Sequence, residues 1–429
     1  MQTDISELYD LYLHHRLIST DTRNISPGCL FFAIRGETYN GNRFASEAIR
    51  KGAAYAVIDD PSMETDRTLL VNDVLESLQQ LASRCRNSLN IPVIAVTGTN
   101  GKTTTKELMN AVLGSYYRVQ STKGNLNNHI GVPLTLLSIG RDTEIAIIEM
   151  GANHPGEIEF LCNLASPTHG LITNIGRAHL EGFGGYEGVI RTKSELYHFL
   201  RNSGGTVLVN GNNSLLLELS AGMKRILYGE TEGFTASGSV LRSDPYLEIS
   251  WLKMPEEYNI KTRLVGAYNF ENVMAAICTG LVFNVPAEKT ILALSAYTPS
   301  NNRSQSLNTK HNQVILDAYN ANPSSMQAAL QNFSRMQSDR KMVLLGDMLE
   351  LGTESAAEHQ AVVDLISKMD FQKVILVGPE FGQASAGRNI TFPDSGSAAE
   401  WLKSNPPEGY TILVKGSRGI GMEKVIESL

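Results

Sequence analysis

Short apolar runs, typical of buried strands, alternate with segments of helical spacing through the last third of this chain. The apolar runs cover residues 314–316, 342–345, 374–377 and 411–414. The segments of helical spacing lie near residues 325–336, 354–368, 397–403 and 422–428. This alternation predicts a parallel sheet with right-handed crossovers. No glycine-rich phosphate sequence follows any of these strands, so we expect a Rossmann-like unit that does not hold the main nucleotide.

The middle of the chain has a similar pattern around one glycine-rich turn. Residues 93–96 predict a buried strand, residues 98–103 are GTNGKT, and residues 106–113 have helical spacing. The further predicted strands are residues 145–148, 171–173, 206–209 and 247–251. We expect a central parallel sheet like that of phosphate-loop ATPases.

The beginning of the chain predicts a small α/β domain. Strands are expected at residues 29–34 and 55–58, with a helix at 44–51 between them. A length of 429 residues corresponds to about three domains, and residues 299–303 are the expected linker to the last one. The expected fold is therefore α/β with three domains: a small N-terminal domain (1–88), a central phosphate-loop domain (89–298) and a C-terminal Rossmann-like domain (299–429).

Composition narrows the function classes. The net charge of -7 provides no basic field for nucleic acid or an anionic membrane. Four widely spaced cysteines form no metal or redox pattern and predict buried free thiols in a reducing compartment. The acidic N-terminus does not resemble a signal peptide, and no apolar stretch is long enough to span a membrane. We expect a cytoplasmic protein, and a monomer by default.

The turn GTNGKT has the chemistry of a phosphate site. Gly98 and Gly101 permit tight turns close to a ligand. Lys102 supplies a positive charge, and Thr103 a hydroxyl suited to a metal ion. A helix that begins here adds unpaired N–H groups and a favourable dipole. Val96 stands where the common pattern has its first glycine, so the loop is a shorter variant. A plain turn with a solvated lysine is the alternative.

Polar residues near other strand ends are further candidates. Glu149 follows a buried run and suits magnesium, unless it caps a helix or lies exposed. His179 is a metal ligand, a proton carrier or a structural histidine. Asn269 and Asn272 share one helix face and suit an adenine edge. The polar segment 121–128 predicts hydrogen bonds to a polar ligand, or a plain turn.

Together these motifs resemble the Mur ligases of peptidoglycan synthesis. The resemblance rests on GTNGKTTT, on Glu149, His179 and Lys193 in this order, and on GAYNFEN followed by Asp317. Further matching segments cover nearly the whole chain: TDTR, PGCLFFAIRGETYNG, GNLNNHIGVPLTLL, EMGANHPGEI, TNIGRAHLEGFG, DAYNANPSSM, LGDMLELG and LVKGSR.

The resemblance implies an ATP-dependent ligase. ATP would phosphorylate the terminal carboxylate of UDP-N-acetylmuramoyl-tripeptide, and the amine of D-alanyl-D-alanine would attack the acyl phosphate to give the pentapeptide, ADP and phosphate. ATP and Mg²⁺ are the implied cofactors. Two positions depart from the family pattern, since Tyr268 stands where histidine is frequent and Asn302 where glycine often precedes Arg303.

The resemblance also assigns residues to each ligand. The implied ATP site contains Gly98, Thr99, Asn100, Gly101, Lys102, Thr103, Thr104, Asn269, Asn272, Arg303 and Asp317. The implied substrate residues are Thr22, Arg23, Arg35 and Gly36 for the uridine nucleotide, Asn127 and Asn128 in a substrate loop, and Asp347, Lys415, Ser417 and Arg418 at the dipeptide end. The implied catalytic set is Lys102, Glu149, His179 and Lys193. From the residues alone, ordinary loop chemistry competes with a uridine site in the first domain.

Two magnesium ions are implied. Thr103 and Glu149 would hold one ion, and His179 and Lys193 the other. The resemblance makes Lys193 a carbamate, because a free ammonium has no lone pair for a metal. The alternative is a surface lysine that pairs with Glu195 or with a substrate phosphate.

Other functions fit parts of the pattern. A small-molecule kinase or another phosphate-loop hydrolase would explain the loop and Glu149, but not the first and last domains. A nucleotide-binding regulator would bind without turnover. Nearer alternatives are a ligase that adds a single amino acid and a folylpolyglutamate synthase. Dependence of phosphate release on both a carboxylate and an amine would separate the ligases from the kinase.

Overall fold

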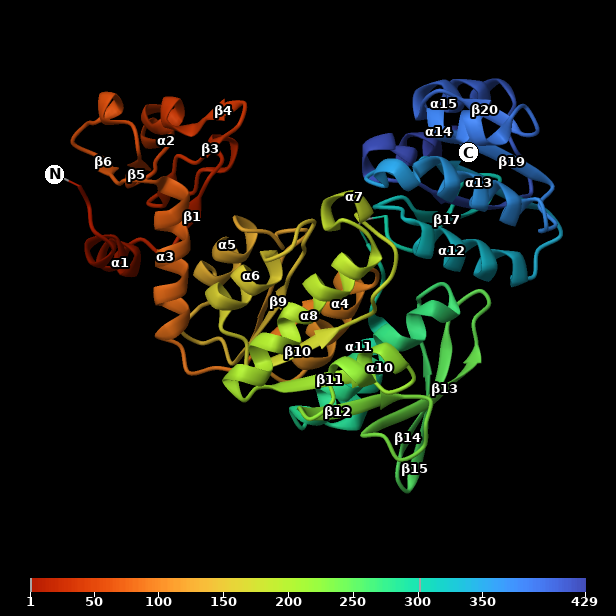
Figure 1. Ribbon diagram of the computed structural model, residues 1–429, viewed down its shortest axis with the longest axis horizontal. Helices are drawn as coiled ribbons and strands as arrows, with labels where there is room; N and C mark the ends of the chain where they lie inside the picture. The colour runs from red at the N-terminus through yellow and green to blue at the C-terminus, as the bar shows by residue number, and fades with distance from the viewer. Residues whose placement is uncertain (1, 301) are drawn as a thin grey trace.

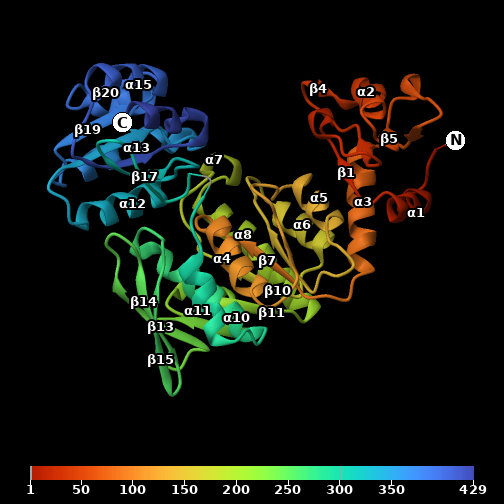
Figure 2. The ribbon, with the colours of Figure 1, turned by 180° about the vertical axis from the view of Figure 1, so that it is seen from behind.

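The structure is a computed structural model that describes residues 2–300 and 302–429. Figure 1 shows three bodies along the chain, with the first in red and orange, the second from orange to green and the third from teal to blue. The view from behind in Figure 2 shows the same arrangement, with the second body below and between the other two.

The first body is a small parallel sheet with helices. Its four parallel strands, in sheet order, are β1 (Ile18–Ser19), β2 (Leu30–Phe32), β5 (Tyr55–Ile58) and β6 (Thr68–Leu70). A separate hairpin consists of β3 (Arg35–Gly36) and β4 (Tyr39–Asn40). The helices are α1 (Ile5–His14), α2 (Ala45–Arg50) and α3 (Val74–Asn87). The predicted strands and the helix between them are confirmed, although the first strand is shorter than expected.

Helix α3 joins the first body to the second (Figure 1). Its buried residues Leu78 and Leu81 belong to the same apolar core as Val132 and Leu136 of α5 (Gly131–Leu137). The two bodies therefore share a continuous core, and separating them would expose apolar surface to water.

The second body is a nine-stranded sheet. Its strands, in sheet order, are β15 (Glu256–Lys261), β14 (Glu248–Lys253), β13 (Ala236–Arg242), β12 (Lys224–Gly229), β11 (Thr206–Asn210), β10 (His169–Ile172), β7 (Val93–Thr97), β9 (Ile145–Glu149) and β8 (Val119–Ser121). Its helices besides α5 are α4 (Lys102–Gly114), α6 (Glu157–Ala165), α7 (Leu180–Phe183), α8 (Tyr186–Ser203), α9 (Ser214–Leu219), α10 (Phe270–Val282) and α11 (Ala287–Ala296).

In sheet order, the expected parallel pairing is confirmed for the strands from β8 to β13. It is wrong for the other end of the sheet, from β13 to β15. Strands β13, β14 and β15 pair antiparallel. Only residues 254–255 connect β14 to β15, and a connection of two residues is too short for the crossover that parallel strands need.

Both faces of the central strands are buried. Ile94 and Val96 of β7 belong to one core with α4 and α10, whereas Val93 and Ala95 belong to the other core with α6 and α8. A strand that is covered on both faces appears in a sequence as an unbroken apolar run, which explains the run that precedes the glycine loop.

The third body is a six-stranded sheet. Its strands, in sheet order, are β16 (Gln305–Asn308), β17 (Gln313–Asp317), β21 (Thr411–Lys415), β18 (Lys341–Gly346), β19 (Lys373–Val377) and β20 (Ile390–Phe392). Its helices are α12 (Pro323–Arg335), α13 (Ser355–Ile366), α14 (Pro379–Ser385) and α15 (Ser395–Ser404).

Two details of the third body differ from expectation. Strand β16 pairs antiparallel with β17, because four residues connect them, so the sheet is not wholly parallel. The predicted last helix forms as a 3₁₀ segment (Met422–Ser428), whose tighter turn is common in short terminal pieces.

The sheets bring several chain segments together at their carboxyl ends. Val96 pairs with Glu149 across β7 and β9, and Asp317 pairs with Lys415 across β17 and β21. Ligands of open α/β sheets bind at such edges. Within residues 2–300 and 302–429, no helix has the length and apolar character needed to cross a membrane.

Candidate active site

A cavity of about 1030 Å³ lies where the second and third bodies meet. It is lined by these predicted residues: Thr99, Asn100, Gly101, Lys102, Thr103, Thr104, Asn127, Asn128, Glu149, His179, Asn269, Asn272, Arg303, Asp317 and Lys415. The structure therefore gathers most of the proposed ATP and metal residues around one space.

The glycines of the phosphate loop are required by geometry. Gly98 has φ of 140° and Gly101 has φ of 79°, and L side chains rarely adopt such values. A Cβ atom at Gly101 would lie 2.6 Å from Oδ1 of Asn272. The loop therefore needs glycine for its backbone conformation and for its close approach to α10.

Asn174, which the sequence did not single out, fixes this loop. Its carbonyl oxygen accepts from the N–H of Thr99 at 2.9 Å, and its side-chain oxygen accepts from the N–H of Asn100 at 3.0 Å. The first intrahelical bond of α4 runs from the Thr105 N–H to the Gly101 carbonyl. The open N–H groups for an anion are thus those of the first helical turn, after the loop itself.

Lys102 lies folded over the loop in this structure. Its Nζ donates to the carbonyl oxygens of Gly98 at 2.8 Å and Thr99 at 3.0 Å. Burial lowers the pKa of Lys102 to about 8, an effect that Glu149 opposes and Arg303 reinforces. Two carbonyl oxygens hold the ammonium group beside the cavity. A negatively charged phosphate bound there would stabilise the protonated form of Lys102.

Glu149 offers a free oxygen to the cavity. Its Oε1 accepts from the hydroxyl of Thr103 at 3.1 Å and from the amide of Asn127 at 2.8 Å. Its Oε2 is buried and has no partner among the described residues. A buried, unpaired carboxylate oxygen beside a hydroxyl suits a hard cation, so these residues fit Mg²⁺. Asn127, expected to contact substrate, orients this carboxylate.

Lys193 is buried, and the alternative of a surface lysine paired with Glu195 is wrong. Glu195 instead accepts from the backbone N–H groups of Gly156 and Glu159. Burial lowers the pKa of Lys193 to about 7, with a further lowering by Lys102. About half of the amine is therefore neutral at pH 7, and carbamylation requires this neutral form.

His179 and Lys193 approach the same aromatic ring. Lys193 Nζ lies 5.2 Å from the ring centroid of Phe183, and the imidazole of His179 packs edge-on at 6.2 Å. The Nδ1 atom of His179 contacts a carboxylate oxygen of Glu350 from the third body. No group of three or more His, Cys, Asp or Glu side chains is arranged as a metal site among the residues described.

The predicted adenine residues are bonded to each other. Asn272 donates to the side-chain oxygen of Asn269 at 2.8 Å and accepts from Thr105 at 2.9 Å. Both side chains are buried and line the cavity. Their relative positions are fixed by this bond before any ligand binds.

The third body contributes a paired set of charges. Lys415 Nζ donates to Asp317 Oδ2 at 2.6 Å, and Asp317 Oδ1 accepts from the N–H of Ser304 at 3.1 Å. Arg303 stacks on Tyr319, with 3.6 Å from its guanidinium carbon to the ring centroid. Lys415 was expected at the dipeptide end, but the structure places it on Asp317.

Two other residues expected at the dipeptide end are bonded to backbone groups. The buried carboxylate of Asp347 accepts from the N–H groups of Glu380 at 3.0 Å and Phe381 at 2.9 Å, at the start of α14. Ser417 is buried, accepts from the N–H of Leu349 and donates to a carbonyl. The expectation that Asp347 and Ser417 face the dipeptide stays a prediction, since backbone groups occupy both side chains here and neither lines the cavity.

Arg418 differs from these two residues, since its side chain is exposed. Its guanidinium carbon lies 5.3 Å from the ring centroid of Tyr319, the ring on which Arg303 stacks. It does not line the cavity but lies beside it.

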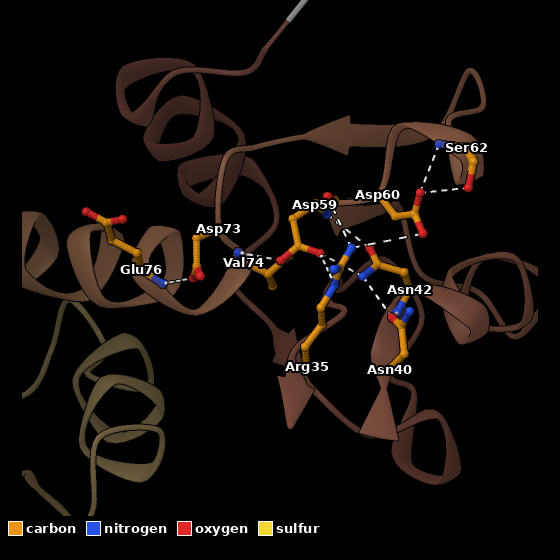
Figure 3. A network of polar contacts seen from close by, with 9 residues as sticks. All are labelled: Arg35, Asn40, Asn42, Asp59, Asp60, Ser62, Asp73, Val74 and Glu76. Atoms are coloured by element: carbon orange, nitrogen blue, oxygen red, sulfur yellow. Dashed lines mark hydrogen bonds and ion pairs between the residues drawn. The ribbon is translucent and has the colours of Figure 1, made fainter. Parts of the chain in front are cut away.

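The predicted uridine residues lie on the first body, away from the cavity. Arg35 and Asn42 both bind Asp59 Oδ1 at 2.7 Å, and Figure 3 shows how this carboxylate ties the β3–β4 hairpin to the sheet. Gly36 lies exposed in β3, and the exposed Arg23 pairs with neighbouring Asp21 beside Thr22. Both views show the hairpin on the side of the first body that faces the third (Figures 1 and 2).

Asn322 links the third body to the phosphate loop. Its side-chain oxygen accepts from the N–H of Ser325 at the start of α12, and its amide donates to Asn100 Oδ1 at 2.8 Å. The sequence carried a helix-start signal here, since asparagine followed by proline is typical of an N-cap. No sequence pattern indicated the hydrogen bond from Asn322 to Asn100 across the domain boundary.

Comparison with known proteins covers all three bodies. Family models described as "Mur ligase family, catalytic domain", "Mur ligase middle domain" and "Mur ligase, glutamate ligase domain" match residues 14–98, 96–280 and 302–418. These three matches follow one another in the order of the observed bodies.

Similar proteins match over nearly their full length. A UDP-N-acetylmuramoyl-tripeptide–D-alanyl-D-alanine ligase of Bacillus subtilis is 35% identical over 96% of this chain and 92% of its own. MurF from Acinetobacter baumannii has a TM-score of 0.86 and 29% identity, covering 96% of this chain and 92% of its own. MurF from Thermotoga maritima, solved with ADP, has a TM-score of 0.85 and 26% identity, covering 98% of this chain and 97% of its own. The chain belongs to the Mur ligase family.

Proposed function

We propose that this protein is an ATP-dependent ligase that joins D-alanyl-D-alanine to UDP-N-acetylmuramoyl-tripeptide. One observation carries the proposal. The open end of α4, Lys102 and the unpaired oxygen of Glu149 share a cavity with charged residues of the third body. Relatives that bear this activity in their names match 96% or more of the chain at 31–35% identity.

The proposed reaction has two steps. The tripeptide carboxylate attacks the γ-phosphorus of ATP, so an acyl–phosphate bond forms and ADP leaves. The dipeptide amine then attacks the acyl carbon, and the tetrahedral intermediate expels phosphate as the amide forms and the amine loses a proton. Lys102 and the first-turn N–H groups of α4 would bind the phosphates. The Nζ atom of Lys102 would then donate to phosphate oxygens instead of the carbonyl oxygens of Gly98 and Thr99.

Magnesium fits beside these groups. Thr103 and Glu149 would hold one ion through the hydroxyl and the free carboxylate oxygen, and His179 with a carbamate on Lys193 would hold a second. Bound ions would offset the negative charge of carboxylate and triphosphate, which otherwise repel each other. The low pKa of Lys193, about 7, supports carbamylation because carbon dioxide adds only to the neutral amine.

The remaining residues would hold the nucleotides. Asn269 and Asn272 would face adenine with the hydrogen-bonding capacity that remains beyond their bonds to each other, to Val265 and to Thr105. Arg303 and Asp317 would lie near the ribose and phosphates. The first body would bind the uridine nucleotide, and Arg418 the dipeptide end. A cytoplasmic location and a monomeric state complete the proposal.

Phosphate release tests the function directly. We expect release from ATP only when UDP-N-acetylmuramoyl-tripeptide and D-alanyl-D-alanine are both present with Mg²⁺, and mass spectrometry should show the pentapeptide. Release with the tripeptide alone at the full rate would instead indicate a hydrolase. A stable phosphorylated product that forms without the dipeptide would indicate a kinase.

Replacing Arg23 with alanine is expected to raise KM for the uridine substrate roughly tenfold and to leave KM for ATP unchanged, since one charge-assisted contact is lost. Arg23 is exposed and far in sequence from the ATP loop, so folding should not change. Steady-state kinetics with each substrate varied would measure both constants. Arg50→Ala, at another exposed arginine of this domain, should change neither. An equal rise in both constants for Arg23→Ala would contradict a uridine site here.

A further inference from the structure

Polar contacts join the third body to the second around the cavity. Asn322 donates to Asn100 at 2.8 Å, and the guanidinium of Arg177 pairs with Glu358 at 2.9 Å. Glu350 adds a third contact between the two bodies, because its carboxylate lies against the imidazole of His179, a proposed metal ligand. A carboxylate from one domain therefore lies against a ring that is assigned to a site in another.

The backbone at both partners is unusual. His179 has φ of 51° and Glu350 has φ of 63°, the left-handed region that non-glycine residues seldom occupy. Such conformations persist where the surrounding structure holds them, and they concentrate at functional sites. Here both members of one contact between domains adopt this conformation.

The loop that carries Glu350 is fixed from several sides. The N–H of Met348 donates to Nε2 of His359 at 3.0 Å, and the N–H of Leu349 donates to the hydroxyl of Ser417 at 3.0 Å. On the other side, a Cβ atom at Gly352 would lie 3.0 Å from the side chain of Glu181 in α7. The loop thus packs directly against the short helix that His179 begins.

The contact selects one nitrogen of the imidazole. Nδ1 of His179 contacts the carboxylate, which can only accept a hydrogen bond, so a bond between them would place the ring hydrogen on Nδ1. Nε2 then keeps its lone pair, and none of the described residues bonds to it, while the side chain lines the cavity. In metal sites a carboxylate behind a histidine commonly fixes the ring and its tautomer in this way.

We propose that Glu350 is a positioning residue that presents Nε2 of His179 to the second magnesium ion. The inference rests on the proposed function, in which His179 is a ligand. Because Glu350 belongs to the third body, this ligand is fully oriented only while that body is docked. Metal affinity at this position is thereby coupled to the placement of the C-terminal domain.

The test uses the full-length protein with Mn²⁺ as the probe and a non-hydrolysable ATP analogue. In the wild type, pulsed EPR should show nitrogen coupling to Mn²⁺ that disappears in His179→Ala. Glu350→Ala should weaken Mn²⁺ binding about ten- to hundredfold. In the protein without Mn²⁺, the ¹⁵N shifts of His179, assigned by their loss in His179→Ala, should lose the Nδ1–H pattern. Glu350→Gln retains an acceptor oxygen and should restore most of both signals.

Glu358→Gln is the matched control, because it removes an ion pair at the same domain boundary without touching His179. It should leave Mn²⁺ affinity and the His179 tautomer unchanged. Equal losses in Glu358→Gln and Glu350→Ala would overturn the inference in favour of simple docking, and an unchanged Glu350→Ala would overturn it outright. If the proposed function is wrong, the wild type will not form the pentapeptide. The ¹⁵N measurement needs no turnover, so it tests the role of Glu350 independently of that result.

Discussion

Replacing Lys102 with alanine is expected to reduce kcat on the order of a thousandfold, since removing one preorganised group that stabilises transition-state charge has effects of about this size. The variant should fold normally. Among the described residues, Nζ of Lys102 donates to two loop carbonyls, and burial lowers the pKa of this lysine to about 8, so its charge contributes little to folding. Phosphate release and thermal unfolding would measure the two effects.

A second lysine of α4 provides the control. Lys106 is buried, and its Nζ donates to the carbonyl of Thr122 at 2.7 Å without lining the cavity. Lys106→Met should lower the melting temperature more than Lys102→Ala does, because it leaves a buried carbonyl without its partner. A near-normal kcat in Lys102→Ala would refute the phosphate-loop interpretation.

Replacing Lys193 with alanine should reduce activity by more than about a hundredfold, because losing a metal ligand should cost at least as much as losing the partner behind one. Acetate or formate should restore part of the activity by supplying the missing oxygen ligand. Acetamide, which has a similar shape but no charge, should not. Lys193→Arg should stay inactive because a guanidinium does not form the carbamate.

Direct detection of the carbamate would complete this test. With ¹³C-bicarbonate, the wild type should show a carbonyl signal that is absent in Lys193→Arg. Burial lowers the pKa of Lys193 from 10.5 to about 7, so the neutral fraction rises with pH through 7. At a constant carbon dioxide concentration, the signal should increase between about pH 6 and pH 8. Full activity in Lys193→Arg would show that only positive charge matters.

The strand pattern predicted the parallel parts of the fold, because fully buried strands form unbroken apolar runs and polar residues mark their ends. It did not predict the antiparallel pairs of β13 with β14, of β14 with β15 and of β16 with β17. Strand direction there depends on short connections, residues 243–247, 254–255 and 309–312, which an apolar pattern does not record.

The sequence was most informative about residues that act within one domain. Thr103, which follows β7, and Glu149, which ends the neighbouring parallel strand β9, share a hydrogen bond, and Lys102 lines the same cavity. Asp347 and Ser417 are bonded to backbone groups, because the residue types that bind ligands also cap helices and fix loops. The roles of Asn322 and Glu350 depend on how domains dock and could not be read from local pattern.

The two boundaries between the bodies differ in chemistry. Helix α3 gives the first and second bodies a common apolar core, whereas the third body has cores of its own, to which the described part of the second body contributes Val265 alone. The polar contacts of the third body with the second can be replaced by hydrogen bonds to water at a small free-energy cost. Exposing the apolar core shared by the first two bodies to water would cost more. We therefore expect the first two bodies to stay joined as the proposed platform for both nucleotides, and the third to be the part that swings away for loading and release.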